Sequence, residues 1–214
     1  MRKNATHQIA LQTQELIDSG VGKKDASVFQ DISSLISVFD ISTYTGKTSP
    51  IFAVHDKHQG DYIAQYISED HNIGEMSIKE GYYIYFTEAH NFLLNEAQNK
   101  KHHAYDGDSL LSEPYTISDL LVLYAAHEVR HKIQENNGIA LFRNGDSSKV
   151  TDPDLKTIIA VLETESDADK YFQDPKEFDS EVIGRYVSQV LHEDMNNFRQ
   201  GTLAAMLKAQ PHHF

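Results

Sequence analysis

Cysteine is absent from this chain, and its absence limits the chemistry available to the protein. Without thiols there is no disulfide, and any zinc ion has to be held by histidine and carboxylate side chains. A chain of 214 residues is long enough to fold around a hydrophobic core without such cross-links. Zero cysteine also fits a reducing compartment, so we expect a cytoplasmic protein.

Positive charge and long apolar runs are scarce as well. The formal net charge is −13 at pH 7, and the basic residues form no cluster. Nucleic acids and anionic membrane surfaces bind through basic patches, so we expect neither as a partner. No apolar run approaches the roughly 20 residues of a membrane-spanning helix. The N-terminal residues also lack the continuous apolar segment of a secretory signal.

Histidine and glutamate, in contrast, occur in a pattern with a specific chemical meaning. His127, Glu128 and His131 form an H-E-x-x-H motif in the stretch YAAHEVRHKIQ. Residues four apart lie on one face of a helix, so the two imidazoles can bind one metal ion. Glu128 lies about 100° around the helix, from where it reaches a metal-bound water without ligating the metal. The motif therefore predicts a zinc site with Glu128 as general base.

The motif has to lie on a helix, and its surroundings predict one. Thr116 is a candidate N-cap, with Asp119 three residues later as in a capping box, and residues 136–138 are typical of a helix end. Elsewhere the apolar spacing predicts a mainly helical chain with a few strands, while segment 61–68 fits either state. We expect helices at 7–19, 25–39, 90–97, 153–172, 175–193 and 196–209, and strands at 51–55 and 82–86.

A catalytic zinc ion needs a third protein ligand, and no histidine follows His131 at short spacing. The third ligand is therefore expected to be an acidic residue on a later helix. Glu177 and Glu165 both fit, since each has an aspartate two residues later and another acid four residues later. That later acid can orient a histidine ligand through its second ring nitrogen. The pair His102–His103 is a less favourable source of a ligand, because adjacent loop histidines are usually exposed.

These two motifs together resemble small bacterial and phage-type zincins, which are minimal gluzincin-like metallopeptidase domains. The resemblance covers residues 116–193 and favours Glu177 over Glu165 as third ligand. Together with the apolar spacing of the N-terminal half, it predicts a single zincin-like α+β domain over 1–214, mainly helical with a small sheet, in which residues 1–45 form a helical N-terminal appendage. The strand at 82–86 is then a candidate for lining the cleft. The matching residues are His127, Glu128, Arg130, His131 and Gln134, followed by Asp174, Pro175, Glu177, Asp179 and Ser180.

The sequence therefore predicts a zinc-dependent peptidase acting on peptides or proteins. Zn²⁺ is held by His127, His131 and Glu177, and Glu128 moves the proton between water and the leaving amine. Two alternatives keep the same ligands: a zinc-stabilised binding or regulatory protein without peptidase activity, and a hydrolase of a non-peptide amide. Gluzincins often stabilise the oxyanion with a tyrosine or histidine, and the candidates are Tyr83, Tyr171 and Tyr186.

Overall fold

The computed structural model describes most of the helices and strands that the sequence analysis predicts. The helices are α1 (Arg2–Asp18), α2 (Lys23–Thr43), α4 (Ile117–Asn137), α5 (Pro153–Ser166), the 3-10 helix η2 (Tyr171–Gln173) and α6 (Pro175–Glu193). The strands are β1 (Ile51–Val54), β2 (Ala64–Ile67), β3 (His71–Ile73), β4 (Met76–Ile78) and β5 (Gly81–Tyr85). The described residues are 2–43, 48–54, 63–73, 76–85, 91, 93–97, 116–137, 142, 150–166, 171–193 and 207–208.

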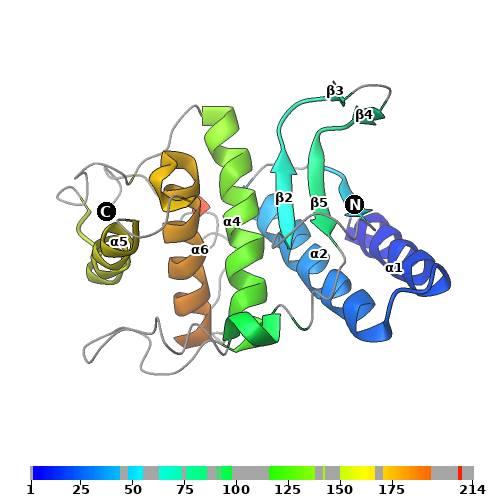
Figure 1. The fold of residues 1–214 in the computed structure, drawn as a ribbon, viewed down its shortest axis with the longest axis horizontal. Coiled ribbons are helices and arrows are strands. Elements are labelled where there is room, and N and C mark those ends of the chain that lie inside the picture. Colours follow the sequence, from blue (N-terminus) through cyan, green and yellow to red (C-terminus); the bar gives the residue numbers. More distant parts are fainter. Residues whose placement is uncertain are drawn as a thin grey trace.

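Helix α4 lies at the centre of this arrangement (Figure 1). On one side it packs against α6, with α5 beyond, and on the other side against α2 and strand β2, with α1 outermost. The predicted fold class, α+β and mainly helical with a small sheet, is confirmed. None of the helices in the described segments has the length and apolar character needed to cross a membrane.

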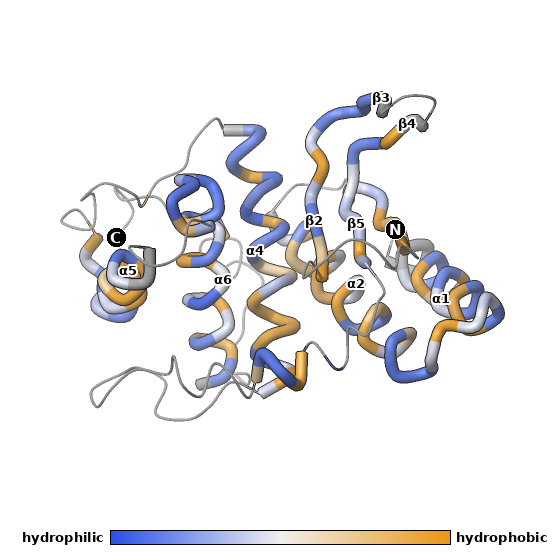
Figure 2. Tube along the Cα trace, viewed as in Figure 1, coloured by the Kyte–Doolittle hydropathy of each residue, from blue (hydrophilic) through white to orange (hydrophobic). Residues whose placement is uncertain are grey.

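Helix α4 begins where the capping signals predict. The Thr116 hydroxyl accepts a hydrogen bond from the Asp119 amide at 3.1 Å, and the Asp119 carboxylate accepts one from the Thr116 amide at 2.7 Å. The first half of α4 is apolar and the second half is hydrophilic (Figure 2). That second half is nevertheless buried, since Arg130 and Gln134 are only 1% and 2% exposed. Buried polar groups of this kind need partners, and residues of α6 and the Leu207 carbonyl supply them.

The N-terminal helices match the two predicted from apolar spacing, and α2 belongs to the same core as α4. Phe29, Ile32, Ile36 and Phe39 of α2 are at most 1% exposed and join the hydrophobic cluster that includes the apolar face of α4. Helix α1 covers α2 from outside. Helix α2 thus forms one side of the hydrophobic core that surrounds α4.

The sheet places strand β2, and not β5, beside α4. Strand order is β1-β5-β2, with β1 parallel and β2 antiparallel to β5. The predicted strand at 82–86 is therefore the central strand β5, whose two sides are both paired. It cannot offer an edge to a substrate, and the expectation that it lines the cleft is wrong. The ambiguous segment 61–68 contains β2, which contacts α4 and forms an edge of the described sheet.

Candidate metal centre

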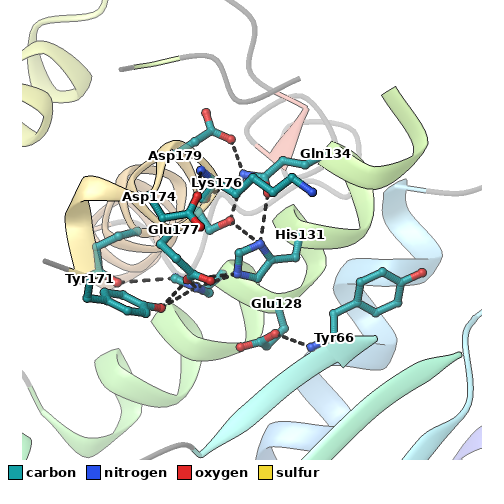
Figure 3. Close-up of polar contacts among 12 residues, drawn as sticks. Tyr66, Glu128, His131, Gln134, Tyr171, Asp174, Lys176, Glu177 and Asp179 are labelled. Atoms are coloured by element: carbon teal, nitrogen blue, oxygen red, sulfur yellow. Dashed lines mark hydrogen bonds and ion pairs between the residues drawn. The ribbon is translucent and has the colours of Figure 1, made fainter. Parts of the chain in front are cut away.

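The two histidines of the motif and Glu177 lie against one another, although Glu177 comes 46 positions after His131 in the sequence. On α4, the His127 and His131 Nε2 atoms are 3.0 Å apart. From the first turn of α6, Glu177 Oε2 lies 3.1 Å from His127 Nε2 and 3.2 Å from His131 Nε2 (Figure 3). These three are the group of side chains, among those described, whose atoms are spaced to hold a metal ion.

The spacing of the three atoms fits a metal ion of the size of zinc. A tetrahedral zinc ion with ligands at about 2.0–2.1 Å keeps its ligand atoms about 3.3 Å apart. The observed separations of 3.0–3.2 Å are close to this value.

The hydrogen bonds of Gln134 orient the His131 ring. The Gln134 side-chain nitrogen donates to the Lys176 carbonyl, to Asp179 Oδ2 and to Ser180 Oγ. Its side-chain oxygen therefore faces His131 Nδ1 at 3.0 Å, and the Ser180 hydroxyl lies 3.2 Å from the same nitrogen. A proton shared between Nδ1 and the Gln134 oxygen would leave the Nε2 atom of His131 to direct a lone pair at the cluster.

His127 has a similar arrangement with a carboxylate in place of the amide. Its Nδ1 atom makes no hydrogen bond but lies 3.5 Å from Glu181 Oε2, and Arg185 holds the other Glu181 oxygen at 2.8 Å. The acid four residues after Glu177 thus lies where the sequence analysis places it. A carboxylate at Nδ1 favours the proton on that side of the ring, so Nε2 again offers a lone pair. Two nitrogen lone pairs and a carboxylate oxygen then converge on one point, which favours a cation.

The charges in the cluster also favour a cation. Burial by itself lowers the pKa of His127, but Glu177 and Glu181 outweigh it and raise that pKa to about 10. Burial raises the pKa of Glu177, but the two imidazoles outweigh this and hold it well below its usual value. The carboxylates around His127 thus favour positive charge at this position, which either a proton on the imidazole or a metal cation at Nε2 would supply.

Glu128 lies beside the cluster but outside the group of ligand atoms. Its Oε2 atom accepts a hydrogen bond of 2.7 Å from the Tyr66 backbone amide on β2. The residue is only 5% exposed, and burial raises its pKa above the ordinary value, an effect that His131 and His127 partly oppose. A buried carboxyl with a raised pKa suits a group that takes up and returns a proton.

A buried ion pair anchors the His131 side of the cluster. The Arg130 guanidinium donates to both Asp179 oxygens, at 2.8 and 3.1 Å, and to the Leu207 carbonyl at 3.0 Å. Asp179 also accepts from Gln134, which accepts from His131. Asp179 is the one acid on an otherwise apolar face of α6, and its burial is explained by this pairing. Arg130 and Gln134 therefore have structural, hydrogen-bonding roles.

The position of Glu177 follows from how α6 starts and how closely it packs. Asp174 caps the helix through its hydrogen bond from the Lys176 amide at 2.8 Å, so Glu177 lies in the first turn. Farther along, a Cβ atom at Gly184 would lie 2.9 Å from the Leu123 carbonyl and 3.5 Å from His127 Cβ. Only glycine lets the two helices approach this closely beside His127.

Of the three candidate tyrosines, only Tyr171 lies at the cluster. Its hydroxyl donates to Glu177 Oε2 and is 3.3 Å from His127 Nε2. Tyr186 donates instead to Asp152, and Tyr83 to the Lys79 carbonyl.

The alternative ligands lie outside the described part of the chain. Glu165 belongs to the last turn of α5, but its side chain is not described, and neither are the two residues 102–103.

The cluster opens into a cleft of about 530 Å³ between β2 on one side and the start of α6 on the other. Its lining residues are Ala64, Gln65, Tyr66, Ser68, His127, Glu128, His131, Glu135, Tyr171, Asp174, Lys176 and Glu177. The residues from β2 carry no sequence signal for this site, because their proximity to α4 depends on the sheet.

In comparisons with known proteins, no protein-family model, no curated protein and no solved structure matches this chain.

Proposed function

We propose that this protein is a zinc-dependent peptidase of the gluzincin-like type that its motifs resemble. The observation that carries the proposal is the convergence of His127 Nε2, His131 Nε2 and Glu177 Oε2, within 3.2 Å of one another, beside the buried Glu128. Three protein ligands with a neighbouring general base are typical of catalytic zinc, whereas structural zinc usually has four protein ligands.

Zinc is the metal that this set of donors favours. Two imidazoles and one carboxylate, with no thiolate in the chain, match the ligands of catalytic zinc in hydrolases. When bound, zinc lowers the pKa of a coordinated water towards ~7 and polarises a carbonyl group. Gln134 is hydrogen-bonded to His131 Nδ1, and the Glu181 carboxylate lies beside His127 Nδ1, so both imidazoles direct their Nε2 atoms towards the cluster.

Glu128 takes the proton from the attacking water and then returns it to the leaving nitrogen. Its position outside the ligand group leaves the carboxylate available for this transfer. Burial raises its pKa above the ordinary value, so its protonated form can act as an acid nearer neutral pH.

The neighbouring strand β2 favours a peptide as substrate. Ala64, Gln65, Tyr66 and Ser68 line the same cleft as Glu128 and Glu177. A strand at the edge of a sheet can bind an extended peptide through main-chain hydrogen bonds. A small non-peptide amide has no extended main chain that could form these hydrogen bonds with the strand edge.

Tyr171→Phe is expected to lower kcat by roughly 10²- to 10³-fold, with zinc content unchanged. The Tyr171 hydroxyl lies 3.3 Å from His127 Nε2, next to the metal position, where it can donate to the oxygen of a carbonyl under attack. Because the hydroxyl acts on the transition state, KM should change much less than kcat. Steady-state kinetics and metal analysis of the purified variant check this. An equal fall in kcat for Tyr186→Phe would remove the assignment, because Tyr186 donates to Asp152 instead.

The proposed function is tested with zinc-loaded protein and an unfolded protein substrate such as casein, with mass spectrometry of the products. We expect new peptide termini, their loss with 1,10-phenanthroline, and their return when zinc is added back. Stoichiometric zinc with no cleavage of casein or of a peptide library would contradict a peptidase and support the binding-protein alternative. Cleavage confined to non-peptide amides would support the other alternative.

A further inference from the structure

The hydrogen bond between Tyr66 and Glu128 comes from an unusual donor, the backbone amide of a strand. The Ile63 carbonyl accepts from the Tyr85 amide, so residues 63 and 65 direct their backbone groups at β5. In an antiparallel pair this direction alternates, so the Tyr66 amide points outward from the sheet. Figure 3 shows Glu128 between this amide and the ligand cluster. An amide at a sheet edge is thus bonded to the carboxylate of the general base.

This hydrogen bond fixes the orientation of the Glu128 carboxylate, because it holds one of the two carboxylate oxygens. Glu128 Oε2 is bound to Tyr66 at 2.7 Å, and the residue is 5% exposed. A hydrogen bond to a charged acceptor in a buried place is strong and short. With Oε2 held by the strand, Oε1 is left for proton transfer.

The side chain of Tyr66 holds the strand at this position. Its hydroxyl donates to Glu80 Oε1 at 3.0 Å, and Ser49 Oγ donates to the same oxygen at 2.7 Å. The ring of Tyr66 also lies 5.0 Å from the ring of Tyr82 on the central strand. Strand β2 is therefore connected to Ser49, in the segment that precedes β1.

From Ser49 the connection returns to α4. The Ser49 amide donates to Asp40 Oδ2 at 2.9 Å, and Asp40 of α2 accepts from Lys132 Nζ at 2.8 and 2.9 Å. Lys132 lies one turn after Glu128 on α4. Asp40 is fully buried and Lys132 is 7% exposed, so the ion pair is protected from solvent. The polar contacts thus form a closed circuit that begins and ends on α4.

We infer that the backbone amide of Tyr66 is a positioning group for Glu128, held in register by the buried contacts through Glu80, Ser49, Asp40 and Lys132. This inference rests on the general-base role proposed for Glu128. It assigns a role to α2 and the sheet, which have no recognisable motif. It also limits how a substrate meets β2: the backbone groups of Ala64 and Tyr66 point away from β5, and the Tyr66 amide is already bonded to Glu128.

Tyr66→Pro tests the inference, because proline lacks the amide hydrogen and is tolerated where an edge amide points away from the sheet. The probe is acetohydroxamate, which binds zinc and a neighbouring carboxylate. We expect normal zinc content, a 10- to 100-fold weaker affinity for the probe, and a fall in kcat with KM within about twofold. Tyr66→Phe keeps the amide and loses only the hydroxyl bond to Glu80, so it should weaken probe binding less than Tyr66→Pro does. Glu128→Gln gives the loss expected when the carboxylate itself is removed.

Wild-type affinity and kcat in a zinc-loaded Tyr66→Pro protein would overturn the inference. If the proline variant fails to fold, the amide-to-ester replacement at position 66 deletes the same hydrogen without changing the side chain, and the same outcomes apply. Probe binding needs zinc but not turnover. A wild type that binds the probe and cleaves no peptide would therefore contradict the proposed peptidase, while the comparison of variants would still decide the role of Tyr66.

Discussion

Glu128→Gln is expected to bind zinc as the wild type does and to lose hydrolysis by about 10²- to 10⁴-fold. Glutamine has nearly the shape of glutamate, and its oxygen can still accept the hydrogen bond from the Tyr66 amide, which is 2.7 Å from Glu128 Oε2. It has no carboxylate to take a proton from water. Because Glu128 is outside the group of ligand atoms, the metal should remain.

Metal analysis and fragment analysis on the same preparation check this expectation. Glu15→Gln is the matched control, because Glu15 is an exposed acid on α1, far from the cleft along the fold. The control should keep full activity and full zinc content. Turnover at the wild-type rate in the Glu128→Gln protein would remove the general-base mechanism, whatever its zinc content.

Arg130→Met is expected to destabilise the protein by about 3–5 kcal/mol, which lowers Tm by roughly 6–20 °C for a chain of this size. Arg130 and Asp179 are 1% and 0% exposed, so the substitution leaves a buried carboxylate without its cation. Zinc affinity should fall as well, since Asp179 holds Gln134, and Gln134 holds His131. Thermal and denaturant unfolding with zinc titration measure both effects.

Two further variants distinguish the loss of the ion pair itself from the cost of leaving the buried Asp179 carboxylate unpaired. Arg130→Met combined with Asp179→Leu removes both charges and should recover part of the stability lost in the single variant. Lys176→Met breaks an exposed ion pair with Glu135 and should cost less than about 1 kcal/mol. A loss for Arg130→Met as small as that for Lys176→Met would show that the buried pair does not anchor the His131 side.

The helices around the site were predictable because their signals are local. The capping residues Thr116 and Asp119 lie three apart, and Asp174 precedes the proline that starts α6. The mainly helical fold class followed from apolar spacing. The expected helix at 153–172 was too long, since residues 171–173 form a 3-10 turn. The final helix at 196–209 lies almost wholly outside the described residues.

The strands were harder to predict, since their pairing is not local. Strands β3 and β4 have three residues each, too few for an alternating pattern to be recognised. Strand β2 could not be distinguished from a helix in the sequence. Its place at the edge depends on β5, which the sequence analysis wrongly took as the cleft strand.

The site residues that lie close together in the sequence were predictable from local spacing, and those brought together by tertiary packing were not. His127 and His131 are one helical turn apart, so their common face follows from the sequence alone. Choosing between Glu177 and Glu165 needed a resemblance, because the distance from α4 to either acid depends on tertiary packing, including the close contact at Gly184. The Tyr66 amide could not be found at all, since a backbone group has no residue-type signal.

Zinc content of the wild type, Glu177→Ala and Glu165→Ala proteins is the most direct test of the metal centre. Glu177 Oε2 lies 3.1 and 3.2 Å from the two histidine nitrogens, so we predict about one zinc per chain in the wild type and in Glu165→Ala. Glu177→Ala should retain little. A wild type that holds no zinc after reconstitution, or a Glu177→Ala protein that keeps it, would contradict the account.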